Sequence, residues 1–108
     1  MNTLNLPEPI AAYFAAEHNP DALGKCLTTN AVMKDDGHIY TGIDAIKTFM
    51  AEVSAKYSAT TVPFDLERKD GFQVVRANVA GNFPGSPIVL SYRFQLARGL
   101  ITSLEVSV

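Results

Sequence analysis

The sequence has 108 residues, 47% of them hydrophobic and 19% charged, which is typical of a globular protein with a buried core, and we expect a single domain over residues 1–108. Nine basic and eleven acidic residues give a net charge of -2 without a cluster of Lys and Arg, so the composition argues against a nucleic-acid partner. One cysteine excludes an intramolecular disulfide and no apolar run is long enough to span a membrane, so we expect a cytoplasmic protein that does not contact a membrane.

The first half of the chain predicts three helices. Pro7 and Pro9 suit a first helical turn, and apolar residues at helical spacing continue this helix to about His18. Asn19-Pro20-Asp21 predicts the start of a second, short helix. A third helix over 41–57 is expected to be the longest, because its apolar residues form one continuous stripe.

The remaining segments predict strands. We expect them over residues 31–36, 60–67, 73–80 and 88–96, with a last strand ending at Val108. Because the strands follow mostly after the helices, the fold class is α+β, with three N-terminal helices packed on a curved, mainly antiparallel sheet. A helix across the concave side of such a sheet leaves a cavity in which a small molecule can bind.

Asp35 is the first candidate for chemistry, because of the alternation along its strand. Lys34 must face water, so Met33 and Asp35 face the opposite, inner side, where apolar surroundings raise the pKa of a carboxyl group. Such a group suits a general base. The alternative is that Asp35 and Asp36 simply begin an exposed turn at Gly37, and the sequence leaves open which of the two faces the interior.

Tyr13 is the second candidate, because it lies on the apolar stripe of the first helix. A buried phenol needs a hydrogen-bond partner, which is either a substrate oxygen or a backbone carbonyl of the core. Combined with an inward-facing Asp35, it indicates proton transfer next to a carbonyl group. In this hypothesis Asp35 is the general base and Tyr13 stabilises the oxyanion.

Further residues are candidates for substrate binding. His38 follows the acidic turn and is a candidate acid or base, although a loop histidine is also typical of a solvated side chain. The aromatic and methionine residues that either line an apolar pocket or belong to the plain core are Phe14, Phe49, Met50, Phe83 and Tyr92. The histidines, the cysteine and the acids match no metal-ligand spacing, and there is no glycine-rich phosphate loop, so we expect neither a metal nor a cofactor.

Four stretches distributed over the whole chain have a likeness to one protein family. They are residues 10–14, 30–37, 42–46 and 81–87, the last of which leads into Tyr92-Arg93-Phe94. Through them the sequence resembles the SnoaL-like branch of the nuclear transport factor 2-like (NTF2-like) superfamily. The resemblance implies a cone-shaped α+β barrel with a pocket at its open end, and a homodimer joined through the outer face of the sheet.

Within this superfamily the sequence is similar to ketosteroid isomerase at two positions. The tyrosine donor of that enzyme corresponds to Tyr13 and its aspartate base to Asp35, whereas its second, protonated aspartate corresponds to Leu90, which cannot donate a hydrogen bond. Losing one oxyanion donor typically lowers the rate by a factor on the order of 10² to 10³. The resemblance therefore implies an isomerase or cyclase for an apolar, carbonyl-containing small molecule. The alternative is a non-catalytic ligand-binding or dimerisation module of the same fold.

Overall fold

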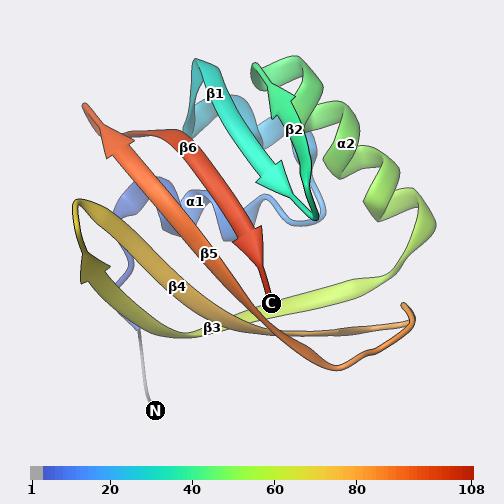
Figure 1. Ribbon diagram of the computed structural model, residues 1–108. Coiled ribbons are helices and arrows are strands. Elements are labelled where there is room, and N and C mark those ends of the chain that lie inside the picture. Colours follow the sequence, from blue (N-terminus) through green and yellow to red (C-terminus); the bar gives the residue numbers. More distant parts are fainter. Residues whose placement is uncertain (1–3) are drawn as a thin grey trace.

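The computed structural model describes residues 4–108, and within them six strands form one sheet (Figure 1). The strands are β1 (Leu27–Asp35), β2 (His38–Thr41), β3 (Ala59–Lys69), β4 (Phe72–Gly81), β5 (Ile88–Ala97) and β6 (Leu100–Ser107). Their order across the sheet is β2-β1-β6-β5-β4-β3. Neighbouring strands are antiparallel except β1 and β6, which are parallel, so the predicted α+β class and mainly antiparallel sheet are confirmed.

Three two-residue turns join antiparallel neighbours. Asp36-Gly37, Asp70-Gly71 and Arg98-Gly99 connect β1 to β2, β3 to β4, and β5 to β6. In each turn the first residue has a φ of 50° to 53° and the glycine a φ of 77° to 81°, the positive values that a type I′ hairpin requires. The first of these turns returns the chain along β1 and forms β2. The sequence prediction missed this strand, because four mostly exposed residues carry no clear alternation.

The helices differ from the prediction in type and length. Within residues 4–108 there are two α-helices, α1 (Glu8–Ala15) and α2 (Ile43–Lys56), while the predicted second helix is a 3-10 segment, η1 (Pro20–Lys25). The first helix ends at Ala15 instead of near His18, because the following backbone forms shorter-range bonds such as Glu17 N to Phe14 O at 3.3 Å. The third predicted helix is confirmed as the longest. In the described part of the chain, no helix combines the length and apolar character needed to cross a membrane.

The sheet is not closed, which corrects the expectation of a cone-shaped barrel. Its edge strands, β2 and β3, are not hydrogen-bonded to each other, and α2 connects them along the chain (Figure 1). Closure is unfavourable because β2 has four residues and β3 contains Pro63, which has no backbone N–H to donate. The sheet still curves, with register shifts next to Pro63 in β3 and between Gln95 and Leu96 in β5.

The core lies between the helices and one face of this curved sheet. Phe94, at 0% exposure in the central strand β5, packs edge-to-face against Tyr13 of α1 with ring centroids 5.5 Å apart. Phe14 contacts the same ring at 5.9 Å. Cys26 is also fully buried in this core, as the apolar stripe of its segment predicts. The Phe94 ring therefore forms a direct packing contact between α1 and the sheet.

Replacing Phe94 by alanine is expected to lower the free energy of unfolding by about 3 to 5 kcal/mol, because it leaves a cavity at the contact between α1 and the sheet. Urea unfolding measures this loss. As a control, Ile39→Ala removes a side chain that is 63% exposed on β2, and we expect a change of no more than about 0.5 kcal/mol. Equal losses for the two variants would contradict the assignment of Phe94 to the core.

Candidate active site

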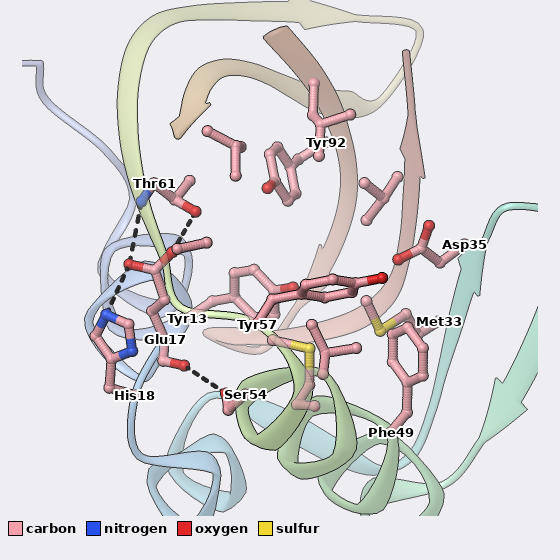
Figure 2. A pocket seen from close by; sticks show the side chains of 16 residues that line it. Tyr13, Glu17, His18, Met33, Asp35, Phe49, Ser54, Tyr57, Thr61 and Tyr92 are labelled. Atoms are coloured by element: carbon pink, nitrogen blue, oxygen red, sulfur yellow. Dashed lines mark hydrogen bonds and ion pairs between the residues drawn. The ribbon is translucent and has the colours of Figure 1, made fainter. Parts of the chain in front are cut away.

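A cavity of about 170 Å³ lies between the curved sheet and α2 (Figure 2). Both helices and five of the strands contribute to its wall. Its size is close to that of the roughly 150 Å³ cavity known to hold one benzene molecule, so it has room for about one ring. Among the described residues there is no group of three or more His, Cys, Asp or Glu side chains arranged to hold a metal ion.

Asp35 is the last residue of β1 and lines this cavity. The predicted alternation is present, since Met33 is buried and Lys34 is exposed while Asp35 is half-buried. Asp36 instead occupies the exposed turn with a φ of 50°. Burial raises the pKa of the Asp35 carboxyl group, the neighbouring Asp36 raises it further, and His38 lowers it. Of the two acids, Asp35 is therefore the one that faces the cavity.

Tyr13 reaches the same cavity from α1. The residue is only 4% exposed, and its ring packs against those of Phe94 and Tyr92, whose centroids are 5.5 Å and 6.3 Å away. Burial raises the pKa of the Tyr13 phenol well above its ordinary range, with further contributions from Tyr92 and Asp35. A phenol with a raised pKa stays protonated near neutral pH and can donate a hydrogen bond.

The other predicted pocket residues fall into two groups. Phe49 and Met50 of α2 and Tyr92 of β5 line the cavity, and burial raises the pKa of Tyr92 to about 12. Leu90 lines it too, so the position of the second acid in ketosteroid isomerase is apolar here. Phe49 also stacks on Tyr40, with centroids 4.2 Å apart.

Phe14, His38 and Phe83 are outside the wall of this cavity. Phe14 packs behind it, 5.0 Å from the Tyr92 ring. His38 is exposed on β2, where its Nδ1 lies 3.1 Å from the backbone oxygen of Asp36. Phe83, in the loop between β4 and β5, packs edge-to-face on Tyr57 at 6.3 Å. These positions follow from the hairpin at Asp36 and from contacts between distant segments, neither of which the aromatic spacing reveals.

Sequence analysis missed a polar group in the cavity wall, made of Glu17, His18 and Thr61. The Glu17 carboxylate accepts hydrogen bonds from the Thr61 hydroxyl and from the Thr61 backbone N–H at 3.1 Å. His18 Nε2 lies 3.6 Å from Glu17 Oε2. A carboxylate four residues after Tyr13, on the apolar face of the first helix, is the signal that could have revealed this group.

No protein-family model matches the sequence, and no curated protein matches it either. Several solved structures are similar. A proposed polyketide cyclase from Sinorhizobium meliloti is 31% identical with a TM-score of 0.91, and the match covers 99% of this chain and 100% of that chain. A protein with a ketosteroid isomerase-like fold from Catenulispora acidiphila, in complex with trimethylamine, is 22% identical with a TM-score of 0.83, covering 96% and 87%. A proposed SnoaL-like polyketide cyclase from Jannaschia is 16% identical with a TM-score of 0.78, covering 98% and 90%.

The raised pKa of Asp35 predicts how stability depends on pH. Above the ordinary value of 3.8 the folded protein holds this proton more tightly than the unfolded chain, so the free energy of unfolding falls as the pH rises from 3.8 through the raised pKa. Asp35→Asn removes this charge, and we expect the variant to be more stable than the natural protein at about pH 7, with a smaller gain at about pH 3. Urea unfolding at the two pH values measures the difference.

Asp36→Asn is the matched control, because Asp36 is exposed in the turn and asparagine tolerates its positive φ. It should show no comparable gain. A loss of stability in Asp35→Asn at about pH 7 would mean that the carboxylate is stabilised by the fold, contrary to the raised pKa.

Proposed function

The chain belongs to the SnoaL-like branch of the NTF2-like superfamily, and we propose that its cavity transfers a proton next to a carbonyl group of a small molecule. Asp35 removes a proton from the carbon beside the carbonyl, and Tyr13 donates a hydrogen bond to the oxygen that becomes negatively charged. The observation that carries this proposal is that a half-buried carboxyl group and a buried phenol line the same small cavity.

The electrostatics of the two groups favour these roles. A raised pKa brings the Asp35 carboxyl closer to neutral pH, where a general base is most effective. The raised pKa of Tyr13 keeps its hydroxyl protonated, so it acts as a donor and not as a competing base. In the step itself a C–H bond breaks, an O–H bond forms on Asp35, and the electron pair moves to the carbonyl oxygen as an enolate.

The enolate leads to either of two reactions. Returning the proton to a different carbon makes the protein an isomerase, whereas attack of the enolate on a second carbonyl makes it a cyclase. The proposed contacts for the apolar part of the substrate are Phe49, Met50 and Tyr92. A volume of about 170 Å³ encloses roughly one ring, which favours a substrate smaller than a steroid or one that enters only in part.

A second candidate function is a non-catalytic module that holds an apolar ligand. Leu90 favours it, because this side chain stands in the cavity wall where a further hydrogen-bond donor would strengthen the oxyanion site. Val79 and Val106 add further apolar surface to the wall. The two functions differ in a measurable way, since only the first requires Asp35 to exchange a proton with the ligand.

We also propose a homodimer through the outer face of the sheet. Val62 of β3 and Val89 of β5 are 56% and 41% exposed, and both are in register with Asn78 of β4, which lies between them. Phe64 is 40% exposed nearby on β3, with the Arg76 guanidinium 5.3 Å from its ring centre. Apolar side chains on one face of the sheet, beside charged ones, suit a two-fold interface in which the same patch meets itself.

Asp35→Asn tests the catalytic proposal. With 3-cyclohexen-1-one as the probe in D2O, the natural protein is expected to accelerate deuterium uptake at the carbon between the carbonyl and the double bond. The variant should lose this acceleration by a factor of about 10² or more, because amide nitrogen and oxygen are poor bases. Proton NMR follows the uptake. The control Asp36→Asn, in the exposed turn, is expected to stay within about threefold of the natural protein.

Tyr13→Phe extends the same assay to the oxyanion. The variant keeps the ring that packs on Phe94 but removes the hydroxyl, so the rate should fall by a factor on the order of 10² while the fold is retained. Ligand binding with unchanged deuterium uptake in both Asp35→Asn and Tyr13→Phe would instead favour the non-catalytic module.

Val89→Lys tests the dimer. A lysine at this exposed position places a charge in the middle of the proposed interface, next to its symmetry-related copy. Light scattering at micromolar concentration is expected to give a dimer mass for the natural protein and a monomer mass for the variant. A monomeric natural protein would refute the interface.

A further inference from the structure

The proposed function leaves unused a second group of polar side chains in the same cavity. Figure 2 shows the Asp35 carboxyl group on one side of the cavity and Glu17, His18 and Thr61 on the other. Among these, His18 carries an imidazole, the type of side chain that most often serves as a general acid or base in proteins. Its side chain is 66% exposed, so it borders both the cavity and the solvent.

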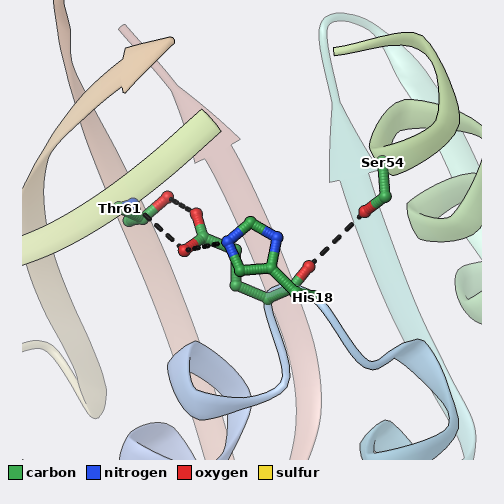
Figure 3. Close-up of polar contacts among 4 residues, drawn as sticks. His18, Ser54 and Thr61 are labelled. Carbon is green, nitrogen blue, oxygen red and sulfur yellow. Dashed lines mark hydrogen bonds and ion pairs between the residues drawn. The ribbon is translucent and has the colours of Figure 1, made fainter. Parts of the chain in front are cut away.

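Glu17, labelled in Figure 2, is held in place from two directions, by Thr61 and by Ser54, which Figure 3 shows from close by. Both oxygens of its carboxylate accept hydrogen bonds from Thr61, one from the hydroxyl and one from the backbone N–H at 3.1 Å. Its backbone oxygen accepts a hydrogen bond from Ser54 Oγ of α2 at 3.5 Å. The carboxylate is therefore tied to β3 while the backbone is tied to α2, and the side chain retains little freedom.

This anchored carboxylate faces the imidazole of the next residue. Glu17 Oε2 lies 3.6 Å from His18 Nε2, a distance at which the two groups attract each other once the imidazole is protonated. Only 23% of the Glu17 side chain is exposed, so solvent screens this attraction less than it would at an open surface. The arrangement orients an acid at the end of the cavity opposite Asp35.

We propose that His18 is a second proton-transfer group of this cavity, that Glu17 is its positioning residue, and that the substrate is a carbonyl compound with a double bond one carbon away from the carbonyl group, reaching from Asp35 to His18. This inference rests on the proposed function and adds the group that completes the reaction. It also identifies the reaction as movement of a double bond along the substrate.

The step balances without a further reactant. Asp35 takes a proton as the C–H bond between the carbonyl and the double bond breaks, and the electron pair spreads over the carbonyl and the double bond as a dienolate. A new C–H bond forms at the far carbon with a proton from the His18 imidazolium. Water then returns a proton to the exposed imidazole, and Asp35 releases its proton to water. One proton enters and one leaves, with no oxidation or reduction.

A purely structural role for Glu17 makes a different prediction. If its bonds to Thr61 only fasten the end of α1 to β3, changes at Glu17 or His18 alter stability and affect every reaction of the cavity equally. If His18 delivers a proton, changes at Glu17 or His18 slow the protonation of the far carbon and leave the removal of the proton beside the carbonyl unaffected. The probe 3-cyclohexen-1-one separates the two possibilities, because deuterium uptake beside the carbonyl requires only the base, whereas formation of 2-cyclohexen-1-one also requires protonation of the far carbon.

We expect His18→Gln to leave deuterium uptake within about twofold and to slow formation of the conjugated ketone about 10²-fold. Glu17→Gln should lower the rate of conjugated-ketone formation relative to that of deuterium uptake by about tenfold. The glutamine still accepts a bond from Thr61 but no longer attracts the imidazolium. The matched control is Glu8→Gln, on the exposed first turn of α1, which should alter neither rate. NMR and ultraviolet absorbance follow the two reactions.

The outcomes separate the two proposals. Normal isomerisation in His18→Gln, with both reactions lost in Asp35→Asn, overturns the role of His18 and leaves the proposed function intact. Normal deuterium uptake in Asp35→Asn overturns the proposed function and this inference with it. A parallel loss of both reactions in His18→Gln and Glu17→Gln supports the structural role and also overturns the inference.

Binding provides a measurement that does not depend on turnover. Hydroquinone carries a hydroxyl at both ends of one ring, whereas phenol carries one, so a cavity with two polar ends should bind hydroquinone about tenfold more tightly. Isothermal titration calorimetry measures both affinities. His18→Ala is expected to abolish this preference, and a preference that survives in the variant would contradict the placement of a second polar end at His18.

Discussion

The packing of the Tyr13 ring on Phe94 joins the first helix to the sheet at the candidate active site. Phe94 lies in the central strand of the sheet and is fully buried, so the helix that contacts it has one favourable position. Glu17 lies in the turn just after α1, and its hydrogen bonds to Thr61 hold its carboxylate at the same cavity. The aromatic contact thus holds the Tyr13 phenol at the cavity that Asp35 also lines, whereas Thr61 of β3 fixes the Glu17 carboxylate there.

The cavity combines an apolar wall with polar groups at two ends. Burial raises the pKa of both Asp35 and Tyr13, which disfavours charge on the carboxyl group and keeps the phenol protonated. The same burial makes an ionised Asp35 unfavourable for the folded state. A fold that retains such a group accepts lower stability at neutral pH, as is common where a site requires a poised acid or base.

Local patterns along the chain revealed much of the fold. Dipeptides such as Asp36-Gly37 and Asp70-Gly71 indicated turns that the structure contains, and alternation along β1 indicated that Met33 and Asp35 share a face. The prediction failed where a strand is too short to show alternation and where backbone hydrogen bonds end a helix early. The four residues of β2 carry too little periodicity, and the end of α1 depends on backbone bonds that tighten after Ala15.

Strand β3 illustrates the limit of such patterns. A period of two places Val62 and Phe64 on one face and Thr61 on the other, but it is Thr61 that faces the cavity, whereas the two apolar side chains are exposed. Periodicity sorts residues into faces without saying which face is covered, because that depends on the neighbouring elements.

The sequence by itself determined the α+β class and the turns, because each of these depends on residues close together in the chain. It gave the inward direction of Asp35 as one of two alternatives, the other being an exposed turn. Only the tertiary structure decided that Phe49 and Tyr92 line the cavity while Phe14 and Phe83 do not. It alone joined Glu17 to Thr61, 44 residues away. Contacts of this kind depend on how the sheet curves and where the helices pack against it, and no local pattern of residues encodes that geometry.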